Sequence, residues 1–87
     1  MSKIEKEITI RNCQGLHARP AALFVQIATK YESDVSVQKD GEVVNGKSIM
    51  GILMLGAQEG SQVKITAEGK DAEEAVKELE EFLSSDE

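Results

Sequence analysis

The chain is poor in the residues that build the commonest metal and nucleic-acid sites. It has no tryptophan, one tyrosine, two phenylalanines, one cysteine and one histidine. So few aromatic residues form no base-stacking platform, which disfavours single-stranded nucleic acid as a partner. The lone cysteine excludes an intrachain disulfide, and one cysteine with one histidine cannot make an ordinary Cys/His zinc site. We therefore expect no metal, no cofactor and no nucleic-acid partner.

Positive charge is also scarce, and so are long apolar runs. Ten Lys and Arg residues against 16 Asp and Glu give a formal charge of 10 − 16 = −6, so the chain lacks the broad positive field that nucleic acid or anionic lipid requires. The longest apolar run, residues 49–55, is much shorter than the roughly 20 residues that cross a bilayer. Residues 1–7 contain no apolar stretch for a signal-peptide core. We expect a cytoplasmic protein with no membrane partner.

What the chain does contain is enough for one folded domain. Its 87 residues are 40% hydrophobic and 30% charged, a balance typical of folded globular proteins. A chain of this length buries roughly two-thirds of its unfolded surface around one core. We expect a single domain over residues 1–87, structured from about residue 4 to residue 83, with short frayed termini.

The spacing of the apolar residues predicts four strands and three helices in the order βαββαβα. Apolar and polar residues alternate at residues 4–11, 35–38, 42–44 and 62–67, as in strands with one buried face. Apolar residues at i, i+3, i+4 and i+7 predict helices at 20–30 and 72–83, and residues 48–55 predict a shorter helix. We expect an α+β open-faced sandwich, in which a four-stranded antiparallel sheet carries three helices on one face and meets water on the other.

Local signals mark the ends of these elements. Asp40-Gly41 can supply the positive φ angles of a tight hairpin turn. Ser48 is suited to cap the second helix, and Gly56 is suited to end it in the left-handed conformation. Asp71, with Glu74 three residues later, resembles a capping pair at the start of the third helix.

Residues 41–48 match the phosphate-loop pattern G-x-x-x-x-G-K-[ST], which raises nucleotide binding as an alternative function. That loop requires a buried parallel strand that ends at its first glycine and a long helix that begins at its last residues. Here Gly41 falls in a hairpin turn, and Val43 and Val44 continue as a strand. The context therefore argues against a nucleotide-binding site.

His17 is the residue best suited to chemistry. Pro20 marks the first turn of a helix, which places His17 at or near the N-cap, beside the free amides of Ala18 and Arg19. These amides form the positive end of the helix dipole, which favours a bound anion and disfavours an imidazolium. We therefore expect a neutral ring whose nitrogen lone pair can attack a phosphoryl group, with Arg19 contacting the same phosphate oxygens. The alternative for both side chains is an incidental surface position.

Residues 49–55 are apolar all round, yet a helix packed on one face of a sheet buries only part of its circumference. If Ile52 and Leu55 point inward, the remaining apolar side chains point to water. Flexible methionines suit a surface that must fit several partners. We assign to this partner-docking surface Leu16, Ile49, Met50, Leu53 and Met54. The alternative is that the helix lies in an oligomer interface.

Residues 15–22, Gly-Leu-His-Ala-Arg-Pro-Ala-Ala, resemble the active-site motif of the HPr phosphocarrier proteins of the phosphoenolpyruvate-dependent sugar phosphotransferase system. Residues 47–51, with Leu55-Gly56, resemble the second signature of that family, and the similarity extends over residues 4–83. The resemblance implies that His17 carries a phosphoryl group on its δ nitrogen, received from enzyme I and passed to sugar-specific enzyme II A components. It also implies that Arg19 steadies the phosphate. Partner enzymes would supply the catalysis, so the protein would be a carrier and not an enzyme.

Ser48 has a structural role as a helix cap and, by the same resemblance, a regulatory one. In relatives with the Lys-Ser-Ile-Met-Gly stretch, this serine is phosphorylated by an ATP-dependent HPr kinase/phosphorylase, and the modified protein acts with a catabolite-control transcription factor. Two family alternatives stay open: a regulatory-only paralogue, whose relatives lack the histidine found at His17, and a nitrogen-branch carrier with the same His17 chemistry. A carrier that shuttles between enzymes is best served by a monomer. We assign no chemistry to Cys13.

Overall fold

The computed structural model describes residues 2–11, 16 and 18–85. These residues form four strands and three helices, and their order confirms the predicted βαββαβα succession. The elements are β1 (Ser2–Thr9), α1 (Ala18–Thr29), β2 (Asp34–Lys39), β3 (Glu42–Asn45), α2 (Ile49–Leu55), β4 (Gln62–Gly69) and α3 (Ala72–Ser84).

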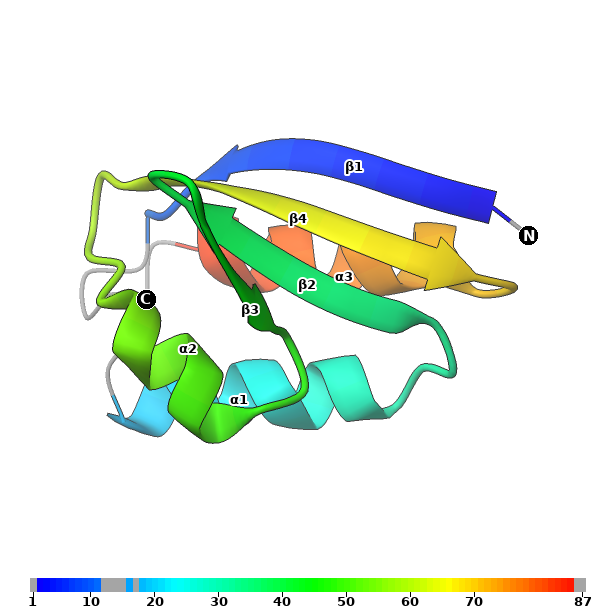
Figure 1. Ribbon diagram of the computed structural model, residues 1–87, viewed down its shortest axis with the longest axis horizontal. Coiled ribbons are helices and arrows are strands. Elements are labelled where there is room, and N and C mark those ends of the chain that lie inside the picture. Colours follow the sequence, from blue (N-terminus) through cyan, green and yellow to red (C-terminus); the bar gives the residue numbers. More distant parts are fainter. Residues whose placement is uncertain (1, 12–15, 17, 86–87) are drawn as a thin grey trace.

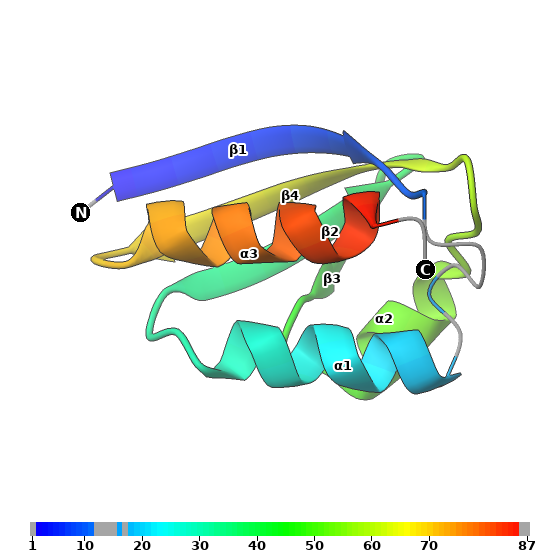
Figure 2. The same cartoon turned by 180° about the vertical axis from the view of Figure 1, so that it is seen from behind.

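The strands form one antiparallel sheet in the order β1-β4-β2-β3. All three helices lie on the same side of this sheet, as Figure 1 and the opposite view in Figure 2 both show. The register pairs Ile8 of β1 with Val63 of β4, and Val37 of β2 with Ile65 of β4, so apolar residues of neighbouring strands share the face that the helices cover. The predicted fold class, an α+β open-faced sandwich, is confirmed.

The core lies between the sheet and the helices. In β4 the buried residues Val63, Ile65 and Ala67 alternate with partly or fully exposed polar ones. Phe24 of α1 and the apolar stripe of α3 cover them, and burying one large apolar side chain of this kind contributes about 1.5–3 kcal/mol. The buried residues of α3 follow the helical repeat that its sequence predicts: Ala72, Ala75, Val76, Leu79 and Leu83.

The predicted hairpin turn and the predicted ends of α2 are confirmed. Asp40 has a φ of 51° and Gly41 a φ of 83°, which join β2 to β3 in a tight turn. At the start of α2 the Ser48 hydroxyl accepts a hydrogen bond from the backbone amide of Gly51, at 3.1 Å. Gly56 ends this helix with a φ of 65°, and its amide donates to the carbonyl of Leu53.

The predicted capping pair at the start of α3 is wrong. Asp71 occupies the N-cap position, but its side chain makes no capping hydrogen bond. Its carboxylate instead accepts from the backbone amides of Glu32, at 2.9 Å, and Ser33, at 3.0 Å, and from the Ser33 hydroxyl. Several hydrogen bonds hold the pKa of Asp71 below its usual value, and the bond from the Ser33 hydroxyl has the largest effect. The Asp71 carboxylate therefore binds a segment that is distant in the sequence and does not cap α3.

Gly69, the last residue of β4, permits this close approach. Its φ is 152°, and a Cβ added there would lie 2.5 Å from the Ser33 hydroxyl oxygen and 2.7 Å from the Ser33 Cα. Ser33 itself is buried. Only glycine suits both the backbone conformation and the space at this position.

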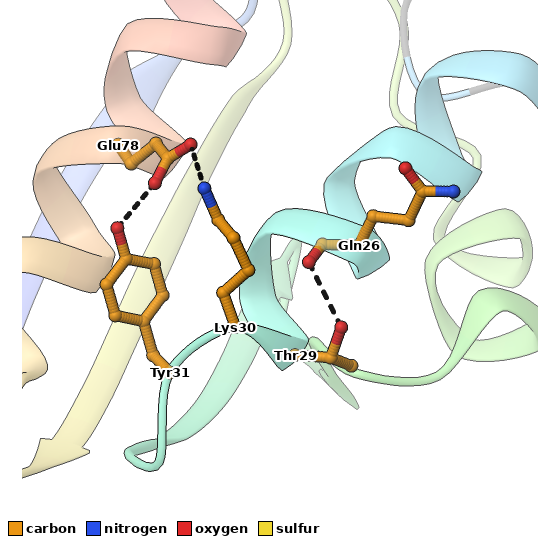
Figure 3. Close-up of polar contacts among 5 residues, drawn as sticks. All are labelled: Gln26, Thr29, Lys30, Tyr31 and Glu78. Carbon is orange, nitrogen blue, oxygen red and sulfur yellow. Dashed lines mark hydrogen bonds and ion pairs between the residues drawn. The ribbon is translucent and has the colours of Figure 1, made fainter.

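A second set of side chains joins the end of α1 to α3 (Figure 3). The Tyr31 hydroxyl and the Lys30 ammonium donate to the two carboxylate oxygens of Glu78, the ammonium at 2.7 Å. The hydrogen bond to Glu78 raises the pKa of Tyr31 to about 12, and the Lys30 ammonium, followed by the Tyr31 hydroxyl, lowers the pKa of Glu78. We call the five residues whose side chains make these contacts the carboxylate clamp: Lys30, Tyr31, Ser33, Asp71 and Glu78.

Across the part of the chain that the structure describes, no helix has both the length and the apolar character needed to cross a membrane.

Candidate functional site

The predicted site begins where α1 begins. The helix starts at Ala18, and its first turn carries no acidic residue. Ala18 and Arg19 are exposed and Pro20 is buried. The first amides of a helix have no partner within it and attract negative charge, so this end of α1 can accept an anion. His17, which immediately precedes Ala18 in the sequence, lies outside the described residues, and so does Cys13.

Arg19 is the basic residue of the first turn of α1. Among the described residues, its guanidinium has no ion-pair partner. The side chain projects from an exposed residue in the first turn of α1. Its planar cation can therefore be used for a phosphate without first breaking a salt bridge within the described part of the molecule.

Leu16 does not belong to the docking surface, and that prediction is wrong. Its side chain is only 2% exposed and belongs to the hydrophobic core. Its backbone amide donates to the carbonyl of Ala57, which follows α2, at 2.9 Å. Leu16, the residue before His17, is thus anchored by its backbone hydrogen bond and by its apolar side chain, since burial of that side chain is more favourable than exposure.

Hydrogen bonds also hold the chain on the N-terminal side of residues 12–15. The amide of Ile10 donates to the carbonyl of Ser61 at 2.9 Å, and the amide of Gly60 donates to the carbonyl of Ile10 at 2.8 Å. The amide of Arg11 donates to the carbonyl of Leu83, near the end of α3, at 2.8 Å. The segment between α2 and β4 therefore supports the chain both before and after residues 12–15.

The short helix α2 lies beside α1, as both views show (Figures 1 and 2). Ile52 and Leu55 are buried, as predicted. The other four large residues are exposed: Ile49 by 45%, Met50 by 66%, Leu53 by 36% and Met54 by 71%. We call these four residues the α2 apolar face.

Sequence analysis missed one exposed apolar residue on α1. Leu23 is 43% exposed, next to the fully buried Phe24. The signal was present in the sequence, because Leu23 falls outside the stripe formed by Ala21, Phe24 and Ala28. Leu23 adds an apolar side chain to the exposed surface of the helix that carries Arg19.

The side chains of Ser48 and Lys47 make contacts within the protein, whereas a nucleotide-binding loop would need these side chains to be free. The Ser48 hydroxyl caps α2, and the Lys47 ammonium donates to the backbone carbonyl of Tyr31 at 2.8 Å. Gly41 lies in the β2–β3 turn, far from a strand-to-helix junction. The alternative of a phosphate loop over residues 41–48 therefore does not match the local structure.

Acidic residues are absent from the sequence around α1 and α2. None of the 16 acidic residues falls within residues 11–31 or 43–58, and these ranges hold four basic ones: Arg11, Arg19, Lys30 and Lys47. The region that contains both helices is thus basic and apolar in a chain of net charge −6. Within the described residues, no group of three or more His, Cys, Asp or Glu side chains is arranged to hold a metal ion.

The fold and this surface together define a small α+β domain that presents an anion-attracting helix start next to an apolar helix face. The family model for the phosphorylation site of the HPr component of the phosphotransferase system, PTS-HPr, matches residues 4–85. The match spans nearly the whole chain, and the chain belongs to the HPr family.

Three relatives illustrate the similarity. A phosphocarrier protein HPr from Bacillus anthracis superposes with a TM-score of 0.92 at 46% identity, over 95% of this chain and 99% of the other. An HPr from Thermoanaerobacter tengcongensis superposes with a TM-score of 0.89 at 52% identity, over 99% and 94%, and an HPr of that organism has also been solved as a dimer. The HPr-like protein Crh from Bacillus subtilis is 42% identical over 95% of this chain and 98% of its own length, and one of its structures is a swapped dimer.

Proposed function

We propose that this protein is a cytoplasmic phosphocarrier, which accepts a phosphoryl group on His17 from enzyme I and donates it to sugar-specific enzyme II A components. When the protein accepts the group, a ring nitrogen of His17 attacks phosphorus, and the bond from phosphorus to the donor breaks as the bond to the ring forms. When it donates the group, a nucleophile of the enzyme II A component attacks phosphorus, and the bond from phosphorus to the His17 ring breaks. The observation that carries this proposal is the start of α1 at Ala18, directly after the family's histidine, with an exposed Arg19 in its first turn. The amides and the guanidinium supply the positive charge that a phosphoryl group needs.

The surroundings of the helix start support docking on a protein partner. The α2 apolar face offers exposed side chains, including two flexible methionines, that can pack against more than one surface. The absence of acidic residues from the sequence of both helices favours a partner whose binding site is acidic at its rim. The catalysis then comes from the partner, and this protein acts as its substrate.

The direct test is phosphorylation with phosphoenolpyruvate and purified enzyme I. We expect an acid-labile, alkali-stable phosphate on the wild type and none on His17→Ala. Arg19→Gln should accept phosphate more slowly, since a charge-assisted contact to the phosphate is lost. No label on the wild type, under conditions that label a known HPr, would contradict the proposal.

We also propose that Ser48 is a regulatory phosphorylation site for an HPr kinase/phosphorylase, and that the modified protein acts with a catabolite-control transcription factor. A phosphate at the start of α2 would be compatible with the fold, because negative charge is favourable at a helix N-terminus. The same charge would stand next to Ile49 and Met50 and would repel an acidic partner. ATP-dependent, acid-stable labelling that is lost in Ser48→Ala would support this role, and no labelling by a cognate kinase would exclude it.

A second candidate is a purely regulatory protein, which the 42% identity to Crh favours. The two candidate functions differ in the residue that they require: the carrier requires the His17 imidazole, whereas the regulator requires only Ser48. Dimeric structures of relatives raise the further question of oligomeric state. We propose that the carrier acts as a monomer, which keeps the α2 apolar face accessible, and sedimentation at micromolar concentration tests this.

A further inference from the structure

A short stretch of chain joins the end of α2 to the residue before His17. Leu55, the last residue of α2, is buried, and Gly56 then turns the chain with φ 65° and ψ 26°. Ala57 follows, is also buried, and accepts the backbone amide of Leu16 at 2.9 Å. A single hydrogen bond thus links the segment after α2 to Leu16, the residue before the proposed phosphoacceptor.

The residues on both sides of His17 in the sequence have fixed positions. Leu16 is held by its buried side chain and by Ala57, and Ala18 is the first residue of α1. Consecutive Cα atoms are a fixed distance of about 3.8 Å apart across a trans peptide bond. A shift in the carbonyl of Ala57 therefore acts on one of the two attachment points of residue 17.

We propose that Gly56 and Ala57 are positioning residues for phosphoryl transfer, because the left-handed turn at the end of α2 sets the position of Leu16, the residue to which the phosphoacceptor is bonded. This inference rests on the proposed function. It assigns these two residues to the transfer step and leaves docking to the α2 apolar face. It also gives Leu16 a role inside the protein in place of the docking role that its sequence suggested.

Gly56 allows a clean test, because a side chain there would touch nothing. A Cβ added at Gly56 has no atom within 4 Å, so Gly56→Ala changes only the preferred backbone angles. Alanine disfavours a φ of 65°, and relaxation toward negative φ redirects the chain after residue 56, including the carbonyl of Ala57. Asparagine tolerates the left-handed conformation, so Gly56→Asn is the conservative variant.

Gly41 provides a matched control in the β2–β3 turn. It has a φ of 83°, and a Cβ added there also has no atom within 4 Å. Gly41→Ala therefore introduces the same kind of backbone strain with no connection to Leu16. A general loss of stability would affect both alanine variants, whereas a positioning effect would appear in Gly56→Ala alone.

The experiment measures transfer from phosphorylated enzyme I and the ring NMR signals of His17, which are unambiguous because the chain has one histidine. We expect Gly56→Ala to lower kcat by about 10- to 100-fold, as a misplacement of about 1 Å does, with KM nearly unchanged. We expect Gly41→Ala and Gly56→Asn to stay close to the wild type. The ring signals of the free protein should shift in Gly56→Ala and stay in place in Gly41→Ala.

The inference is overturned if the two alanine variants give the same kcat and ring signals, or if the loss in Gly56→Ala lies in KM alone. If Gly56→Ala does not fold, Ala57→Gly replaces it, because this variant keeps the carbonyl of residue 57 and gives its backbone more freedom. The expected loss of kcat and the results that would overturn the inference are the same. A wild type that accepts no phosphate would contradict the proposed function instead. The ring signals would then decide the positioning role by themselves.

Discussion

The two ends of the helical layer are built from different interactions. One end, which we call the docking end, comprises the start of α1, the α2 apolar face and residues 56–61. There, backbone hydrogen bonds join residues 56–61 to Ile10 and Leu16, and large apolar side chains stay exposed. At the other, the carboxylate clamp ties the chain after α1 to α3 through charged and hydroxyl side chains that already have partners. Figures 1 and 2 show the two ends at opposite tips of α1.

This difference separates stability from recognition. Side chains that are committed to internal hydrogen bonds must lose them before they can bind a partner, whereas exposed apolar side chains gain from being covered. Substitutions at distant sites without shared partners have effects that are nearly additive. We therefore expect changes at the clamp to alter unfolding with normal transfer, and changes at the exposed apolar side chains of the docking end to alter transfer with nearly normal unfolding.

The largest expected effect on stability is at Gly69, at the clamp. Gly69→Ala should lower the free energy of unfolding by about 2–4 kcal/mol, since a Cβ would crowd the backbone of Ser33 and the residue would be strained. Gly60→Ala is the control, because Gly60 also has positive φ, 88°, but open space around it, and should lose only about 1 kcal/mol. Urea unfolding measures both variants. Equal losses would show that the approach of Gly69 to Ser33 contributes nothing.

The next effect concerns binding at the docking end. Met50→Glu should raise KM for phosphorylated enzyme I by at least about 10-fold, because it places a negative charge on the α2 apolar face. Its free energy of unfolding should change by less than about 0.5 kcal/mol, since Met50 is exposed. Val43→Glu is the control, because Val43 is 60% exposed but lies on β3. A similar rise in KM for both variants would refute a docking role for α2.

A smaller effect is expected at the start of α2. Ser48→Ala removes the acceptor of the Gly51 amide and should reduce the free energy of unfolding by about 1 kcal/mol. Ser48→Asp keeps a capping acceptor and should stay close to the wild type in stability. Thermal unfolding of the two variants provides the comparison. If Ser48→Ala loses nothing, the cap does not stabilise this short helix.

The finest distinction is the dependence of stability on pH, which should reside at the clamp. The folded pKa values of Asp71 and Glu78 are lowered from 3.8 and 4.5, so their stabilisation is present above those values and is lost as the pH falls through the lowered ones. Tyr31 has a raised pKa, so its contribution is complete below pH 10 and is lost as the pH rises toward about 12.

Urea unfolding at a series of pH values tests this. Asp71→Asn should flatten the acid limb of the stability curve, and Tyr31→Phe should flatten the alkaline limb. Glu81→Gln, on the exposed side of α3, is the control and should leave the curve unchanged in shape. An acid limb that is as steep in Asp71→Asn as in the wild type would show that Asp71 does not carry the pH dependence.

The sequence predicted most of the fold because its signals are local. Alternation set the strands, the repeat of Ala72, Ala75, Val76 and Leu79 set α3, and Ser48 and Gly56 marked the ends of α2. The burial of Ile52 and Leu55 and the exposure of the α2 apolar face also followed from the helical repeat. The role of His17 stays a prediction, because it lies outside the described residues.

The errors came from contacts between distant parts of the chain. Asp71 has the local signature of a helix cap, but the amides of Glu32 and Ser33 compete for its carboxylate, and nothing near it in the sequence announces them. Leu16 stands next to a proposed functional residue, yet its burial depends on the packing of the whole core and on the carbonyl of Ala57. Propensities and spacing carry no information about such pairings.

The most direct test of the division between the two ends is an amide NMR titration of the isotope-labelled protein with enzyme I. We expect the perturbed signals to fall at the start of α1, along α2 and in residues 56–61, and those of residues 30–33 and of α3 around Glu78 to stay in place. Perturbations centred on the carboxylate clamp, with α2 unaffected, would contradict the account.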